Sequence, residues 1–420
     1  MESVFAVVDI YFVSRLGADA VAVVGLTESM MTIIYAIAVG LSIATTAIVA
    51  RRIGEKNPHG ATIAAVQAIG IGIFISLPIM AIGIIGSQRL LQLMGASTHT
   101  IESYSGYTAV MLRGNVVIML IFIINAVYRA AGDAAIAMRV LWLANILNCI
   151  LDPCLIFGLG PFPELGVEGA AIATNIGRGS AVIYQFALLG RKGRITVQRT
   201  DIKIDIKVIL RLLRLSLGGI GQLVIATSSW IGLYRIVAVF GSEALAGYTI
   251  AIRIVIFSLL PSWGMSNAAA TLVGQNLGAH KPERAEKSVW ISGLINVIFL
   301  CGVGVLFNLF SGFFVELFTS EENVVAIGRT CLRILSLGYL FYGFGMVTTQ
   351  AFNGAGDTTT PTIMNLFCFW LLEIPLAYLL AIALGMDEKG VFIAIVIAES
   401  TLGLLGVLLF KRGTWKSRIV

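Results

Sequence analysis

Charged residues are scarce in this sequence. Only 12% of its 420 residues are Asp, Glu, Lys or Arg, whereas 58% are hydrophobic. Soluble domains have about 25% charged and about 45–50% apolar residues, so a soluble globular protein is excluded. Several segments also run for roughly 20 residues with few charges, which is enough to cross about 30 Å of hydrocarbon. The composition therefore predicts a multi-pass protein whose main partner is the lipid bilayer.

The residues on which most enzymes depend are also few. The three His residues, His59, His99 and His280, fall in or near predicted loops. The five Cys residues lie in apolar segments without metal-ligand spacing, as is typical of small packing residues. The phosphate-binding pattern G-x-x-x-x-G-K-S/T does not occur, so we expect no bound ATP. The sequence predicts neither an enzyme nor a bound cofactor.

Apolar segments follow one another along the whole chain, which predicts an all-α integral membrane protein with twelve transmembrane helices. The 45 Gly residues fit close packing between such helices, because small residues let two backbones approach each other. The segments lie near 3–15, 21–50, 61–86, 103–126, 136–159, 167–190, 208–239, 245–276, 286–310, 325–352, 359–385 and 389–411.

Lys and Arg concentrate in alternate loops between these segments. By the positive-inside rule, the even-numbered loops and both termini of a protein in the cell membrane then lie in the cytoplasm. The net charge of +6 reflects this topology, and we expect no nucleic-acid partner. The basic residues of these loops and of the C-terminus are Arg51, Arg52, Lys56, Arg129, Arg191, Lys192, Arg194, Arg199, Lys203, Lys281, Arg284, Lys287, Lys411, Arg412, Lys416 and Arg418.

The chain also repeats itself with an offset of 224 residues. An even number of helices in each half gives both halves the same orientation, so the sequence predicts two parallel six-helix repeats. We expect an N-terminal lobe at 1–190, a basic cytoplasmic linker at 191–207 and a C-terminal lobe at 208–420. The matched pairs are Gly17/Gly241, Gly54/Gly278, Pro58/Pro282, Gly132/Gly356 and Gly166/Gly390.

The same offset predicts that the first helix is truncated at the N-terminus. The first helix of the second half begins near residue 208, whereas Met1 corresponds to position 225. Roughly 17 residues that would open the first helix are therefore absent. Either the start codon is assigned too late or the chain was truncated.

The stretch LNCILDPCLIFG at 147–158 carries polar groups inside an apolar segment. An ionised Asp near the bilayer centre costs roughly 2.5–3.5 kcal/mol on insertion scales, so Asp152 must face protein or water. Asn148 lies four residues before Asp152 and shares its helix face. Pro153 has no N–H to donate, which leaves the Cys149 carbonyl open near the same region. Asp9, in the first apolar segment, is the natural second carboxylate.

These groups can hold a cation in two ways. Carboxylate, amide and carbonyl oxygens are the ligands that a hard cation such as Na⁺ prefers. Burial also favours the protonated form of a carboxyl group, so the same residues could take up H⁺ instead. The sequence leaves both ions open. The second half has Leu at the positions that match Asp9, Asn148 and Asp152, so the fold does not need these polar groups. The matching residues are Leu233, Leu372 and Leu376.

Along nearly its whole length the sequence resembles the multidrug and toxic compound extrusion (MATE) transporters. The resemblance is carried by VVDIYFVSRLGADAVAVVGL (7–26), RAAGD (129–133), NGAGD (353–357), NCILDPCLIFGLG (148–160) and LGVEGAAIAT (165–174). It implies V-shaped six-helix lobes around a central cavity. It also implies export of organic, often cationic, small molecules in exchange for a cation.

The resemblance further implies which residues bind the coupling cation. In MATE transporters a first-lobe cation site lies on helices 1 and 5, and the matching residues here are Asp9, Asn148 and Asp152. They are also the possible Na⁺ ligands. Tyr107 and Thr174 are added only by their approximate positions on neighbouring helices.

Three further acids, Glu28, Glu373 and Glu399, lie in apolar segments, and we expect them near an interface or in local pairs. Some MATE transporters carry acids in helices 7, 8 and 10. Here those helices have none beyond Glu243 in a short loop. This departure argues against a second-lobe site and favours the DinF-like branch.

The predicted function is an antiporter, coupled to H⁺ or Na⁺, that exports organic compounds by alternating access. We expect these compounds to be lipophilic cations, and we assume a monomer. One alternative is a lipid-linked saccharide flippase of the same wider superfamily. It would need a basic cavity on which Arg113, Arg178 and Arg253 converge, whereas otherwise we expect these arginines to snorkel or to bond helix ends. The other alternative is a membrane-embedded enzyme or receptor, which would need clustered catalytic residues at one interface.

Overall fold

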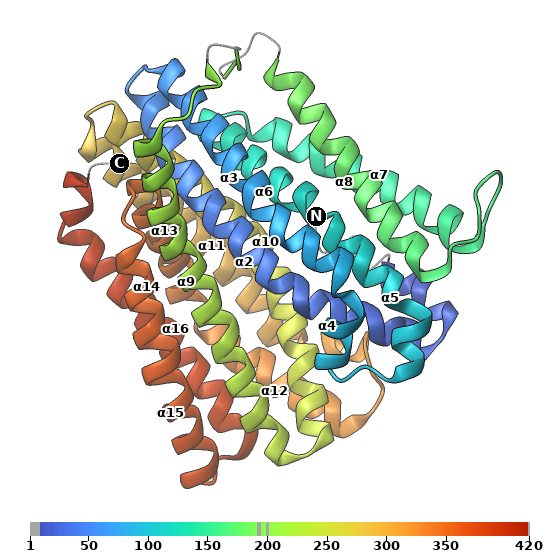
Figure 1. Cartoon of the computed structure of the whole chain (residues 1–420). Helices are drawn as coiled ribbons and strands as arrows, with labels where there is room; N and C mark the ends of the chain where they lie inside the picture. Colours follow the sequence, from blue (N-terminus) through green and yellow to red (C-terminus); the bar gives the residue numbers. More distant parts are fainter. Residues whose placement is uncertain (1–8, 191–194, 199–200, 419–420) are drawn as a thin grey trace. The chain divides into compact units, whose positions relative to one another are not determined.

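The computed structural model describes residues 9–190, 195–198 and 201–418, and all regular structure in these ranges is helical. The described residues form two compact units, and Figure 1 shows the helices of the whole chain. Unit 1 holds the residues up to Val49 together with Asn57–Ser216, and unit 2 holds Ala50–Lys56 together with the residues from Leu217 onward. The predicted linker is described only in part, since residues 191–194 and 199–200 lie outside these ranges.

Unit 1 contains most of the first-half helices. Residues 9–13 are helical and lead into the first named element. The elements are η1 (Ser14–Leu16), α2 (Ala18–Gly54), α3 (Pro58–Ile85), α4 (Ser87–Leu93), α5 (Thr98–Arg113), α6 (Asn115–Ala131), α7 (Ala134–Phe157) and α8 (Gly166–Leu189).

Helix α9 (Ile206–Val237) begins among the unit 1 residues and continues into unit 2. The other second-half elements are η3 (Ala238–Phe240), α10 (Ser242–Gly278), α11 (Pro282–Glu316), α12 (Glu322–Leu337), α13 (Tyr339–Ala355), α14 (Thr359–Asn365), η4 (Leu366–Glu373), α15 (Ile374–Tyr378), η5 (Leu379–Ala383), α16 (Asp387–Lys411) and η6 (Thr414–Ser417).

These helices confirm the predicted all-α membrane fold. Among the described residues, nine helices are long and apolar enough to cross a membrane, and the pair α12 and α13, bent by 59°, makes a tenth. Helix α8 coincides with the sixth predicted segment, although it contains Glu168 and Arg178 and is not one of these ten. The first segment is described only from Asp9 onward, so its expected truncation lies outside the described residues.

The predicted internal repeat is reproduced in the backbone. Helices α2 and α10 are both 37 residues long, and their bounds differ by the same 224 residues as the sequence blocks. Gly17 and Gly241, which precede them, have φ values of 115° and 99°. Gly132 and Gly356 end α6 and α13 in the left-handed conformation, with φ of 90° and 85°. Each of these positive φ values favours Gly, which explains why the repeat keeps Gly there.

The repeat also interrupts one span at the same place in both halves. Gly114 separates α5 from α6, and Gly338 separates α12 from α13. Each Gly N–H bonds back to a carbonyl of the preceding turn, with Gly114 N to Val110 O at 2.9 Å and Gly338 N to Leu335 O at 3.1 Å. Only the second-half pair bends by more than 40° at the break. The halves therefore share a helix break but differ in its geometry.

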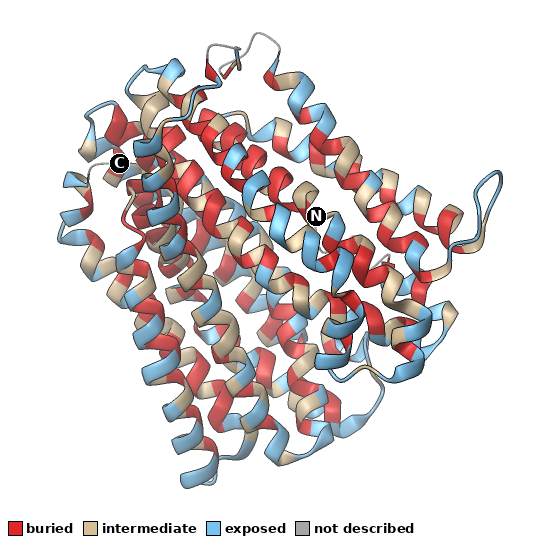
Figure 2. Ribbon diagram, in the orientation of Figure 1, coloured by how far each residue is buried: buried red, intermediate tan, exposed pale blue. Residues whose placement is uncertain are grey.

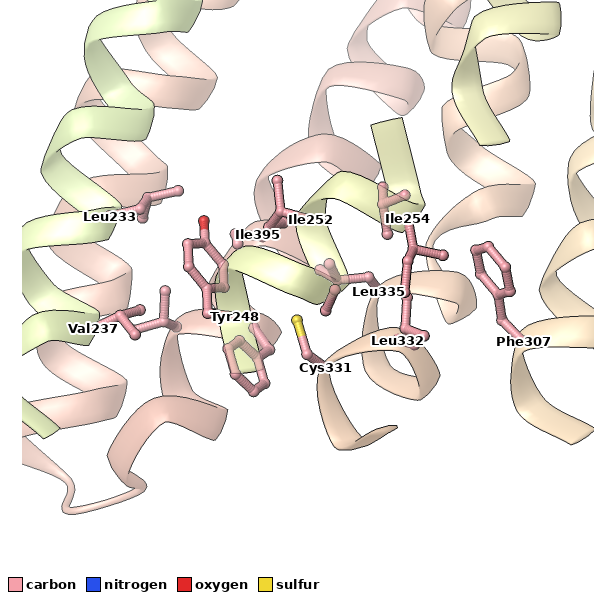
Figure 3. Close-up of a cluster of buried hydrophobic side chains, with 14 of the residues drawn as sticks. Leu233, Val237, Tyr248, Ile252, Ile254, Phe307, Cys331, Leu332, Leu335 and Ile395 are labelled. Carbon is pink, nitrogen blue, oxygen red and sulfur yellow. The ribbon is translucent and has the colours of Figure 1, made fainter. Parts of the chain in front are cut away.

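The apolar surfaces follow the membrane assignment. In unit 2 a buried cluster includes Leu233, Tyr248 and Leu332 from different helices (Figure 3). Other large apolar side chains are exposed, such as Phe74 at 75% and Leu371 at 65%, and such residues recur along η4 and η5. Figure 2 shows exposed residues along the outer helices of the second half. Exposure of this kind is expected where helices face lipid tails rather than water. The Cys residues follow both patterns: Cys331 is buried as predicted, but Cys149 is exposed.

Candidate functional site

Close packing between α7 and α8 sets the geometry of the candidate site. The two helices lie side by side (Figure 1) and make extensive contact within unit 1. Gly169 and Gly177 of α8 meet the α7 backbone so closely that an added Cβ would lie 2.4 Å from Leu155 O and 2.8 Å from Ala144 O, respectively. Small residues every fourth position, completed by Ala173, allow this approach. It places Thr174 of α8 beside the polar face of α7.

Four predicted residues meet in one hydrogen-bonded cluster. Asn148 Nδ2 donates to Asp152 Oδ1 at 2.9 Å, to Asp9 Oδ1 at 3.3 Å and to Thr174 Oγ1 at 3.2 Å. Thr174 Oγ1 donates to the other carboxylate oxygen of Asp9 at 3.1 Å. The carboxyl groups of Asp9 and Asp152 also lie within hydrogen-bonding reach of each other. Three separate helical segments therefore contribute to a single polar centre.

This centre is closed to its surroundings. Asn148 and Asp152 are 0% exposed, Thr174 is 1% exposed and Asp9 is 5% exposed. Two oxygen atoms in it, Asn148 Oδ1 and Asp152 Oδ2, are buried and have no hydrogen-bond partner. A buried polar atom without a partner costs about 1–3 kcal/mol, so these oxygens are the available ligands for a cation or a proton. Together with Asp9 they are the residues that could hold Na⁺.

Tyr107 of α5 belongs to the same neighbourhood. It is 1% exposed, and its hydroxyl group is buried without a hydrogen-bond partner. The hydroxyl interacts electrostatically with the carboxyl groups of Asp9 and Glu28. The structure therefore brings all five predicted site residues together, although Tyr107 makes no direct hydrogen bond to the other four.

Arg178 is a residue that sequence reasoning placed wrongly. We expected its side chain to snorkel or to bond a helix end, but it is only 6% exposed. Its guanidinium group interacts with the carboxyl groups of Asp9 and Glu28, and Nη2 lies 3.4 Å from the hydroxyl of Tyr35. A buried cation beside two acids offsets part of their charge. Arg178 lies one helical turn after Thr174, and that spacing was the sequence signal that could have identified it.

Comparison with known proteins assigns the family. The family model described as MatE matches residues 1–154 and 220–379, which is more than half of the chain. The chain belongs to the MatE family. Members of this family are transporters, so the prediction that the protein is not an enzyme is confirmed. The two matched ranges fall in the two halves of the repeat.

Similar proteins cover almost the full length of this MatE chain. It is 27% identical to the probable multidrug resistance protein NorM of Thermotoga maritima over 100% of this chain and 90% of that protein. It is 27% identical to a FAD transporter of Shewanella oneidensis over 97% of this chain and 90% of that protein. A solved structure of a multidrug resistance MATE family transporter in an outward-facing conformation superposes with a TM-score of 0.92 at 26% identity, covering 99% of this chain and 93% of that one. The DinF-like branch stays a prediction.

The second half of this MatE protein does not repeat the cluster, but it is not free of buried acids. Leu233, Leu372 and Leu376 occupy the matching positions, as the sequence shows. Glu373, which we expected near an interface or in a local pair, is 3% exposed in η4 and interacts electrostatically with Glu399. The residue of the first half that matches Glu373 is Cys149, which directly follows Asn148.

Proposed function

We propose that this protein exports small organic compounds, with lipophilic cations as the preferred class, in exchange for a small cation. The two six-helix halves alternate access to the substrate from the two sides of the membrane. The observation that supports cation coupling is the buried cluster in which Asn148 donates to both Asp9 and Asp152 and Thr174 donates to Asp9. Several similar proteins are named for multidrug resistance or export, which supports the substrate class.

H⁺ is the coupling ion that the arrangement supports best. Two carboxyl groups in direct contact cannot both be ionised without strong repulsion, so they hold one proton between them. Asn148 directs its Nδ2 donor toward both carboxyl groups, which suits a pair that shares one negative charge. In this mechanism, release of the proton exposes two like charges and shifts the balance between the two access states.

Na⁺ is the second candidate for a specific reason. Asn148 Oδ1 and Asp152 Oδ2 are oxygens without partners, and a hard cation prefers such ligands. A rotation of the Asn148 amide by half a turn would present its oxygen to the carboxylates, since amide orientation is decided by the surrounding hydrogen bonds.

The flippase alternative is not favoured. In unit 1, Arg113 is exposed at the end of α5, whereas Arg178 is buried and interacts with Asp9 and Glu28. These two arginines do not form a joint basic patch for a pyrophosphate group. We further propose that the protein is a monomer that spans the cell membrane several times, with both termini in the cytoplasm.

Efflux from proteoliposomes tests this function. The reconstituted full chain is loaded with a fluorescent organic cation, and either a pH gradient or a Na⁺ gradient is imposed. We expect efflux to accelerate when the outside is more acidic than the inside, because H⁺ then moves inward as the substrate leaves. An inward Na⁺ gradient alone should have a smaller effect. FAD, named for one similar protein, serves as the comparison substrate. Efflux that is insensitive to both gradients, or restricted to FAD, would contradict the proposal.

A further inference from the structure

The second half contains an acidic pair, a buried Glu373 and a partly buried Glu399, that the proposed mechanism does not use. Glu373 ends η4, and Glu399 lies in the middle of α16. With the repeat offset of 224 residues, they match Cys149 and Asn175, which directly follow Asn148 and Thr174. Each acid of the second half is therefore displaced by one residue from a member of the first-half cluster. The acids of the second half therefore do not align with the cluster residues of the first half position by position.

The pair is assembled from the corresponding helices. Glu373 and Glu399 interact electrostatically, and the hydroxyl of Ser229 in α9 contacts the Glu373 carboxyl group. Helices α9 and α16 and the η4 segment are the seventh, twelfth and eleventh spans. They correspond to the first, sixth and fifth spans, which provide Asp9, Thr174 and Asn148 in the first half. Both halves thus bring together acidic and hydroxyl groups from the same three spans of the repeat.

Buried polar atoms without partners surround this pair. Glu373 Oε2 and the hydroxyls of Tyr342 and Tyr248 are buried and accept or donate no hydrogen bond among the described residues. Tyr342 interacts electrostatically with both acids, and Tyr248 with Glu373. Figure 3 shows Tyr248 among apolar side chains such as Leu233 and Ile252. Such an arrangement leaves several oxygens free for a ligand in surroundings that exclude water.

The backbone at Glu373 is also unusual. The η4 and η5 segments on either side of α15 are π-helical, whereas α7, the matching element of the first half, is a continuous α-helix. Pro375 lies between them and has no N–H to donate. π-Helical turns are rare and occur frequently at functional sites. Here they alter the rotation of the helix just where the acidic side chain is located.

The groups facing Glu373 define the charge of the ligand. They are Glu399 of α16, Tyr248 of α10, Tyr342 of α13, Cys368 of η4 and Ser229 of α9. None of these described neighbours carries a positive charge. Two acids without a basic partner among these neighbours attract a cation.

We propose that Glu373 and Glu399, with Ser229 and Tyr342, form a second site that loads a small monovalent cation, H⁺ or Na⁺, in the C-terminal half. The inference rests on the proposed function, because it adds a second coupling ion to the same transport cycle. The protein would then exchange one cation in each half.

Counting bound cations in the purified full chain tests this. Binding of radioactive Na⁺ reports sodium, and a pH-indicator dye reports protons taken up after an acid pulse in buffer without Na⁺. We compare the wild type with Asp152→Asn, Glu373→Gln, their combination, and Glu322→Gln as a control at an exposed acid of the same half. Because the two sites belong to different halves, their losses should add. We expect each single site variant to retain about half of the wild-type count, the combination almost none, and the control all of it.

Several results would overturn the proposal. If Asp152→Asn alone removes all cation binding, no second site exists, and this result does not depend on the folding of any Glu373 variant. An unchanged count in Glu373→Gln, and in Glu399→Gln, would have the same meaning. The proposed function fails separately, if the wild type binds cations but does not couple their gradients to efflux.

Discussion

At the scale of single residues, the candidate site depends on Asn148, which donates to three acceptors from one amide nitrogen. This shared donor holds the carboxyl groups of Asp9 and Asp152 together against their repulsion. Replacement of either acid by its amide keeps the shape but removes a charge that the coupling ion must balance. We therefore expect replacement of these acids to impair transport strongly and to affect the folding of the protein much less.

Asp152→Asn should abolish cation-driven efflux while the protein inserts into the membrane at a normal level. The reason is that an Asn cannot take up or release a proton and binds Na⁺ more weakly than a carboxylate. Efflux from proteoliposomes measures the effect, and Asp133→Asn is the matched control, because the Asp133 side chain makes no capping hydrogen bond at the start of α7. Normal transport by Asp152→Asn at normal expression would refute the assignment.

Thr174→Val should weaken cation binding but not eliminate it. The change removes the hydroxyl that donates to Asp9 Oδ2 and keeps the side-chain volume. A hydrogen bond to a charged group contributes about 1.5–3 kcal/mol, which corresponds to a loss of roughly tenfold or more in apparent affinity. Thr174→Ser restores the hydroxyl and should restore the affinity. If Val and Ser behave alike, the Thr174 hydroxyl has no part in binding.

At the scale of helices, the site depends on how closely α7 and α8 approach. The small residues of α8 determine the separation of the two backbones, and that separation determines whether Thr174 reaches Asn148 and Asp9. Hydropathy alone marks both helices as apolar segments but carries no information about their separation. The spacing of Gly169, Ala173 and Gly177 is the local pattern that indicates it.

Gly169→Ala should lower both the thermal stability and the cation affinity. A Cβ there would lie 2.4 Å from Leu155 O, so the helices must move apart. Gly179→Ala is the control on the same helix, because no atom lies within 4 Å of its added Cβ. Since Ala favours a helix over Gly by about 1 kcal/mol, the control should keep or raise the melting temperature. Thermal unfolding in detergent measures both, and equal effects would contradict the packing argument.

At the scale of the whole molecule, the two halves share one backbone plan but differ in their chemistry. Helix bounds, left-handed glycines and the Gly break between two helices all recur with the same offset. The polar groups do not recur position by position, and the π-helical segments occur only in the second half within the described ranges. The repeat therefore accounts for the scaffold but not for the polar sites.

The shared plan predicts equal responses to matched substitutions. Gly132→Ala and Gly356→Ala each place a side chain in a left-handed conformation, with φ of 90° and 85°. The cost is about 1–2 kcal/mol for each. We expect similar decreases in melting temperature for the two variants and an additive decrease for the double variant. A large difference between them would show that the two turns are not equivalent.

The sequence by itself determined the membrane class, the helical spans, the repeat and the acids Asp9 and Asp152, because hydropathy, spacing and internal similarity are local properties of the chain. Only the tertiary structure decided that Thr174 and Tyr107 join these acids, that Arg178 is buried near them, and that Glu373 faces Glu399. Those contacts depend on the rotation and separation of helices that are distant in sequence. Packing between whole helical surfaces sets these quantities, and no single segment encodes them.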